Sequence, residues 1–285
     1  MHHFTYGAFT PVLAYLMSFV GSLLGLKCTA RAARAEGVVR GAWLVTAAVS
    51  IGGTGIWVMH FIAMLGFSVS GMHIRYHVGL TLLSAALAIG IVGGGLLLVG
   101  FGGGRARTLL LGGVVTGVGV AGMHYTGMAS MDMEGEISYQ YGFVLLSVLI
   151  AVAAATAALW FATRVRGMQA MVGAALIMGV AVTGMHYTGM AAMRVRTPDG
   201  LHTPSGAEGI DFLLPLIVAV SIVSFAVLLI VSVNPEQDDL VFAHRDGPGR
   251  TAGERAPRPQ GPPPGTAPGT ARRQAGQWFG GEPPR

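Results

Sequence analysis

The chain has 285 residues, of which 52% are hydrophobic and only 11% are charged, and its formal net charge is +5. The charged residues fall between long uncharged stretches, as is typical of a protein that crosses the membrane several times. Aromatic and basic residues are not interleaved, so the positive charge does not indicate a nucleic-acid partner.

Seven apolar windows are long enough for a transmembrane helix, which needs about 20 mainly apolar residues. They cover residues 8–26, 41–65, 80–101, 109–131, 141–161, 170–193 and 212–233. None of these windows contains Asp, Glu, Lys or Arg. Because a helix satisfies its own backbone hydrogen bonds in lipid, the sequence predicts an all-α membrane protein with seven transmembrane helices.

The basic residues predict how the chain is oriented in the bilayer. Eight of them fall in the loops on one side: Lys27, Arg31, Arg34, Arg40, Arg105, Arg107, Arg164 and Arg166. The opposite loops contain only Arg75, Arg194 and Arg196. Since short cytoplasmic loops carry the excess of Lys and Arg, we expect the N-terminus outside and the C-terminus in the cytoplasm.

The composition changes abruptly after the seventh window. Residues 1–233 form the predicted membrane domain, whereas residues 234–285 are rich in Pro, Gly, Arg and Ala. Such a segment buries too little apolar surface to fold, so we expect a disordered cytoplasmic tail. It contains no phosphate-binding loop and no cluster of catalytic carboxylates, and we therefore expect no enzymatic activity from this chain.

One motif occurs three times, near the ends of the second, fourth and sixth windows. Its copies are Met59-His-Phe-Ile-Ala-Met64, Met123-His-Tyr-Thr-Gly-Met128 and Met185-His-Tyr-Thr-Gly-Met190. The three histidines are 64 and 62 residues apart, and each repeat contains two spans. We therefore predict three parallel two-helix repeats plus one extra helix, with the histidines at one depth, about 12 Å below the outer boundary.

Polar ligands repeated at one depth in apolar helices indicate a metal site. On a helix, positions i, i+4 and i+7 share one face, which adds Met131 and Met193 to the second and third copies. The candidate ligands are Met59, His60, Met64, Met123, His124, Tyr125, Met128, Met131, Met185, His186, Tyr187, Met190 and Met193. Thioether with imidazole favours copper, especially Cu(I), whereas zinc usually takes thiolates or carboxylates, which these spans do not offer. The set exceeds one coordination sphere, so we expect one or two copper ions, or additional methionines that pack and guide the metal in from outside.

Other interpretations of the same residues stay open. The three histidines can join the helices by hydrogen bonds without a metal. Tyr125 and Tyr187 fit the enrichment of Tyr near membrane interfaces, or they supply a hydroxyl to a bound ligand or an oxygen ligand to oxidised copper. Five further histidines fall on the predicted outer side, where each taken alone is a solvated surface residue: His2, His3, His73, His77 and His202.

The Met-His-Tyr-Thr sequences at 123–126 and 185–188, with the divergent Met59-His-Phe-Ile62, resemble the signature of the MHYT domain, a bacterial membrane sensor module. The resemblance covers residues 1 to about 233. It implies a multi-pass protein of the bacterial cytoplasmic membrane that binds copper near the outer face and senses oxygen, carbon monoxide, nitric oxide or a related redox signal. Many members carry cytoplasmic output domains after the seventh helix; without one here, we expect signalling through an unknown cytoplasmic partner.

The leading hypothesis is thus a non-enzymatic copper-binding sensor in the lipid bilayer. The second is copper handling, meaning uptake or delivery to a cuproenzyme. A third is a haem protein that uses two of the histidines, or a histidine and a methionine, as axial ligands.

Overall fold

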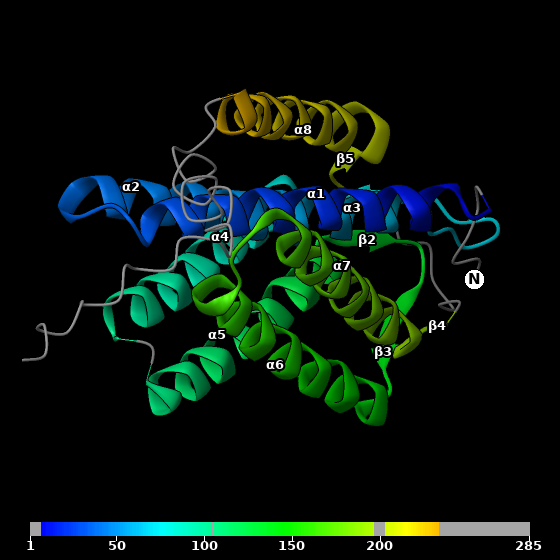
Figure 1. Cartoon of the computed structure of the whole chain (residues 1–285). Coiled ribbons are helices and arrows are strands. Elements are labelled where there is room, and N and C mark those ends of the chain that lie inside the picture. The colour runs from blue at the N-terminus through cyan, green and yellow to red at the C-terminus, as the bar shows by residue number, and fades with distance from the viewer. Residues whose placement is uncertain (1–6, 104, 197–202, 234–285) are drawn as a thin grey trace, which may run out of the picture. The chain divides into compact units, whose positions relative to one another are not determined.

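The computed structural model describes residues 7–103, 105–196 and 203–233, which contain seven long helices (Figure 1). Six are α1 (Phe9–Ala32), α4 (Val78–Phe101), α5 (Ala106–Ala129), α6 (Tyr141–Arg164), α7 (Met168–Ala191) and α8 (Gly209–Val233). The second spanning helix is continuous from Gly37 to Leu65 but has three parts: α2 (Gly37–Ala48), η1 (Val49–Val58) and α3 (Met59–Leu65). All seven are long and apolar enough to cross a membrane, so the predicted number of helices is confirmed.

The middle of the second spanning helix is a π-helix, which the sequence analysis did not predict. The segment η1 has ten residues, whereas most π-helical segments are single-turn bulges inside α-helices. Its glycines lie against neighbouring backbones: a Cβ on Gly52 would lie 2.5 Å from the carbonyl oxygen of Ala88 in α4. On the other side, a Cβ on Gly21 of α1 would lie 2.4 Å from the backbone nitrogen of Gly55. The π-helical segment is therefore clamped between α1 and α4.

This second spanning helix is the most buried of the seven, since α1, α4 and α8 all pack against η1. The helix α1 also packs against α7, and α5 lies between α4 and α6. Figure 1 shows α8 on the opposite side of α1 from α5 and α6. The first copy of the motif therefore lies at the centre of the helix bundle.

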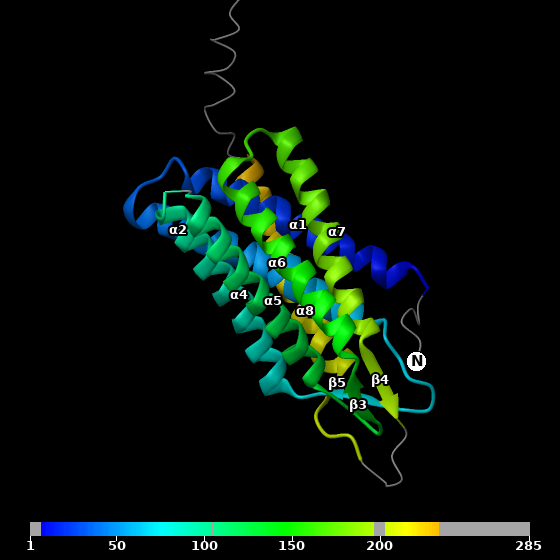
Figure 2. The same cartoon turned by 90° about the horizontal axis from the view of Figure 1, so that it is seen from below.

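Short strands follow the three motif helices, although the sequence analysis predicted only helices. They are β1 (Ile74–Tyr76), β2 (Met131–Met133), β3 (Glu136–Tyr139), β4 (Met193–Arg196) and β5 (Ala207–Glu208). They form one antiparallel sheet in the order β2-β1-β5 and one antiparallel β3-β4 pair. Figure 2 shows β3, β4 and β5 gathered at one end of the helices.

These strands correct two predicted helix ends. The windows 109–131 and 170–193 place Met131 and Met193 on their helices, but α5 ends at Ala129 and α7 ends at Ala191. Met131 instead pairs with Tyr76, and Met193 pairs with Tyr139. Strand pairing satisfies the backbone groups that leave the helix, so both methionines are buried without lying on the helical face that carries the histidine. Phe67, the matching residue of the first copy, likewise lies beyond the end of α3.

Candidate metal centre

The three motif helices end in register around the histidines. Each histidine lies five residues before the last residue of its helix: His60 in α3, His124 in α5 and His186 in α7. At a rise of about 1.5 Å per residue, equal spacing from the helix end places the three imidazoles at one level. The predicted common depth therefore follows from the matched helix ends.

The three imidazoles converge on one another and are shielded from solvent. The Nδ1 atom of His60 lies 3.0 Å from Nδ1 of His186 and 3.2 Å from Nδ1 of His124. The ring centroids are 4.9–5.1 Å apart, and the ring planes are close to perpendicular. Each residue is at most 1% exposed. We call this cluster of His60, His124 and His186 the histidine triad.

The outer nitrogens of the triad face glycines of the neighbouring motif. A Cβ on Gly127 would lie 2.4 Å from Nε2 of His60, and a Cβ on Gly189 would lie 2.2 Å from Nε2 of His124. Both Nε2 atoms are buried and have no hydrogen-bond partner in the described part of the chain. The Gly of the motif thus makes room for the imidazole of another copy.

The spacing of the nitrogens fits one metal ion. Three nitrogen ligands at about 2.0 Å from a common ion lie about 3.3–3.5 Å apart in tetrahedral or trigonal geometry. The two Nδ1–Nδ1 distances of 3.0 and 3.2 Å are only a few tenths of an ångström shorter. The triad is also the single group of three His, Cys, Asp or Glu among the described residues whose ligand atoms are close enough to hold a metal ion. A small outward movement of the rings would complete a three-nitrogen site.

All eight candidate methionines are buried, with exposures between 0 and 5%: Met59, Met64, Met123, Met128, Met131, Met185, Met190 and Met193. Three of them, Met64, Met128 and Met190, follow a triad histidine by four residues within the same α-helix. That spacing puts each thioether about 6 Å from its histidine along the helix, on the same face. The helices therefore present a layer of soft sulfur ligands beside the layer of nitrogens.

The two tyrosines of the motif lie beside the triad, half-buried. Their rings pack edge-on against the preceding histidines, with ring centroids 4.9 Å apart for Tyr125 and His124 and 5.0 Å apart for Tyr187 and His186. The hydroxyl of Tyr125 shares a hydrogen bond of 2.8 Å with Ser147 in α6. This hydrogen bond holds α5 against α6. The Tyr125 hydroxyl would have to leave Ser147 to bind a metal.

The loop histidines lie away from the triad. His73 is largely exposed, with Nδ1 3.8 Å from a carboxylate oxygen of Glu134, and His77 precedes α4 at the surface. His2, His3 and His202 lie outside the described residues. His73 and His77 are therefore surface residues in this structure.

Two residues near the triad were missed by the sequence analysis. Trp57 is buried and donates its indole N–H to the hydroxyl of Ser84 at 3.0 Å, which ties the first motif helix to α4. Tyr76, the last residue of β1, is buried with the centre of its ring 6.2 Å from that of Phe61, and burial raises the pKa of its phenol above the usual value. Trp57 offered one sequence signal, its place two residues before the first motif copy, whereas Tyr76 lies twelve residues after that copy and offered none.

The fold and the site define a class: a multi-pass helical membrane protein with a buried cluster of three histidines whose ligand atoms are close enough to hold a metal ion. Comparison with known families narrows this class. Residues 53–113, 117–175 and 179–243 each match the MHYT repeat, described as a bacterial signalling protein N-terminal repeat. The chain therefore belongs to the MHYT family.

Several curated bacterial signalling proteins are similar to this chain. The bifunctional diguanylate cyclase/cyclic di-GMP phosphodiesterase MucR of Pseudomonas aeruginosa is 42% identical over 233 residues, covering 79% of this chain and 33% of the relative. The cyclic di-GMP phosphodiesterase NbdA of the same species is 33% identical, covering 69% and 25%. The signalling protein YkoW of Bacillus subtilis is 29% identical, covering 70% and 26%.

The chain thus spans a third or less of the length of these curated relatives, and it aligns with their sensor region. No solved structure matches it significantly.

Proposed function

We propose that this protein is a membrane sensor that binds copper through the histidine triad and the neighbouring motif methionines. The observation that carries the proposal is the cluster of three buried imidazoles: Nδ1 of His60 lies 3.0 Å from that of His186 and 3.2 Å from that of His124, and one ligand nitrogen of each ring lies within 4.8 Å of the other two. When bound, the metal supplies a redox-active centre with an affinity for small ligands. The protein positions the imidazoles, excludes water and surrounds the centre with thioether side chains.

Copper is the metal that best suits this donor set. Thioether sulfur binds Cu(I) well and binds Mg²⁺, Ca²⁺ and Mn²⁺ poorly. Along α3, α5 and α7, the ligand groups nearest the triad are thioethers. None of these three helices contains a carboxylate. The same geometry disfavours haem held by two of the histidines, because Nδ1 atoms 3.0 and 3.2 Å apart leave no space for a macrocycle between the rings.

The proposal places the triad toward the outer face of the bacterial cytoplasmic membrane. The basic loops at the opposite helix ends favour a cytoplasmic location for those ends. The residues after the motif helices would then form an outer cap of strands, through which the buried Met131, Met133 and Met193 provide a path from the surface. Residues 234–285 would form the cytoplasmic tail.

Metal occupancy would be transmitted by helix packing, because the triad joins α3, α5 and α7, which make few direct contacts with one another. Drawing the Nδ1 atoms toward or away from a common ion changes the spacing of α3, α5 and α7. We propose that the bound state, a redox change or a diatomic gas such as oxygen, carbon monoxide or nitric oxide is read in this way. The names of MucR and NbdA suggest that the cytoplasmic partner belongs to cyclic di-GMP signalling.

Metal analysis of the full chain purified in mild detergent tests this function. The native protein should retain copper, and a variant with His124→Ala and His186→Ala should lose it. A variant with His73→Ala and His77→Ala is the matched control, because it also removes two histidines but leaves the triad intact, and it should keep its copper. Equal metal content in all three proteins would refute the proposed site.

The second candidate function is copper handling, which uses the same ligands but requires release of the metal. The buried methionines of the strands favour passage of copper toward or away from the triad. Cellular copper in a deletion strain separates the two functions, because loss of a sensor leaves total copper nearly unchanged, whereas loss of an uptake or delivery protein lowers it or moves it between compartments.

A further inference from the structure

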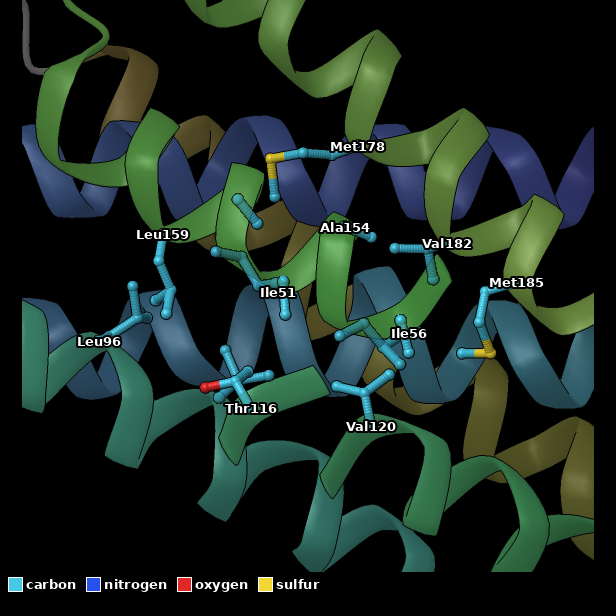
Figure 3. A pocket seen from close by; sticks show the side chains of 14 residues that line it. Ile51, Ile56, Leu96, Thr116, Val120, Ala154, Leu159, Met178, Val182 and Met185 are labelled. Carbon is cyan, nitrogen blue, oxygen red and sulfur yellow. The ribbon is translucent and has the colours of Figure 1, made fainter. Parts of the chain in front are cut away.

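An apolar cavity of about 40 Å³ lies one helical turn from the histidine triad (Figure 3). Three of its lining residues, Ile56, Val120 and Val182, each precede a triad histidine by four residues. Four residues correspond to about 6 Å along a helix, so the cavity directly adjoins the triad layer. Figure 3 shows these side chains converging from different helices, together with Met185, the residue before His186.

The remaining walls explain why the space is open. The helix α6 lines the cavity with four alanines, Ala151, Ala154, Ala155 and Ala158, and with Leu159 at one end. Two more lining residues, Ile51 and Ile56, belong to the π-helical segment η1. Because π-helical turns occur often at functional sites, their presence at the wall of this cavity is consistent with a binding role.

The chemistry of the walls makes the cavity dry. Among the described residues that line it, Thr116 is the single one with a polar side chain. Its hydroxyl has no hydrogen-bond partner in the described chain and lies against α4, where a Cβ on Gly95 would be 2.2 Å away. A buried water needs about two to four polar partners, so one hydroxyl does not hold it. An empty apolar cavity gains dispersion contacts when a small apolar molecule fills it.

We propose that this cavity binds an apolar diatomic gas and holds it beside the metal of the triad. The ligand class follows from the walls and the size: the cavity exceeds the roughly 10–15 Å³ that one water-sized molecule needs, and it is far smaller than the roughly 300 Å³ of the smallest drug-like pockets. The role of the gas rests on the proposed copper site, whereas binding in the cavity does not require the metal.

Xenon, an apolar atom, probes the cavity without the metal. Crystals of the metal-free full chain under xenon pressure should show xenon density between Val120, Val182 and Ala154. Ala154→Leu should abolish this density by filling the space, and Ala153→Leu should retain it, because Ala153 is the exposed neighbour on α6. If Ala154→Leu prevents folding, Ala154→Val fills the cavity less and replaces it. Val182→Ala enlarges the cavity and should increase xenon occupancy. A native cavity without xenon, or undiminished xenon in Ala154→Leu, would overturn the proposal.

Carbon monoxide tests the link to the metal, with infrared detection of the C–O stretch in Cu(I)-loaded protein. Ala154→Leu should weaken carbon monoxide binding by about tenfold or more, since holding both the gas and the new side chain overpacks the cavity, while its copper content stays native. Native affinity in Ala154→Leu would overturn the role of the cavity. Absence of copper from the native protein would instead refute the proposed function, and the xenon experiment would still decide whether the cavity binds a gas.

Discussion

Replacing Gly127 by Ala provides a direct test of how the triad is built. A Cβ at this position would lie 2.4 Å from Nε2 of His60, whereas ordinary contacts with a Cβ begin at 3.4 Å. The His60 ring must therefore move by about 1 Å. His60 is 1% exposed, so the neighbouring buried side chains resist this movement.

The magnitude of the effect follows from the tolerance of metal coordination. Metal–ligand distances in proteins hold to within about 0.2 Å, so a displacement of about 1 Å removes His60 from the coordination sphere or opens the whole site. We expect Gly127→Ala to weaken copper binding by about tenfold to 100-fold, as is usual when the support of a ligand is lost. Overpacking should also lower the free energy of unfolding by about 1–3 kcal/mol.

Gly122→Ala is the matched control, because Gly122 lies in the same helix and a Cβ there meets nothing within 4 Å. In both variants, replacing Gly by Ala stabilises the helix by up to about 1 kcal/mol. The two variants therefore differ only in the contact with His60. Competition with a Cu(I) chelator gives the affinity, and thermal unfolding in detergent gives the stability. Gly189→Ala and Gly184→Ala repeat the pair in α7, where the Cβ on Gly189 would lie 2.2 Å from Nε2 of His124.

Equal copper affinity in Gly127→Ala and Gly122→Ala would refute this account of the triad. The first copy of the motif has Ala63 at the equivalent position, so the threefold arrangement is not strict and the prediction concerns Gly127 and Gly189 alone.

Three further predictions concern the aromatic residues around the triad. Burial raises the pKa of Tyr76 in the folded protein, so as the pH rises this tyrosine ionises first in the unfolded chain, near pH 10. Ionisation stabilises the unfolded chain, and the free energy of unfolding therefore falls as the pH rises above that value. Tyr76→Phe should therefore flatten the loss of unfolding temperature between about pH 8 and about pH 11; an unchanged alkaline slope would contradict this. Trp57→Phe should lower the free energy of unfolding by about 1 kcal/mol through loss of the bond to Ser84, whereas Trp160→Phe, at an exposed position, should have little effect. Tyr125→Phe should retain copper, because its hydroxyl is held by Ser147, and a loss as large as that of His124→Ala would show that the phenol is a ligand.

Several features of the site are encoded in short stretches of the sequence. The seven spans and the equal placement of His60, His124 and His186 follow from apolar length and from the repeat, and both are encoded in short stretches of chain. The donor chemistry is equally local, since Met and His occupy fixed motif positions. Orientation in the membrane rests on the basic loops and stays a prediction.

Other features depend on contacts between distant segments. Met131 and Met193 look like continuations of a helical stripe, but pairing with Tyr76 and Tyr139 draws them into strands. The π-helical segment η1 lies between the backbones of α1 and α4; its glycines permit this close approach, but they do not by themselves predict π-helical hydrogen bonding.

The sequence by itself therefore determined the membrane architecture, the threefold repeat and the soft nitrogen and sulfur ligands, because hydropathy and residue type act over one helix at a time. Only the tertiary structure decided that Nδ1 of His60 lies 3.0 and 3.2 Å from those of His186 and His124, that motif glycines make room for the imidazoles and that an apolar cavity lies beside them. These properties are set by how closely helices far apart in the sequence approach each other.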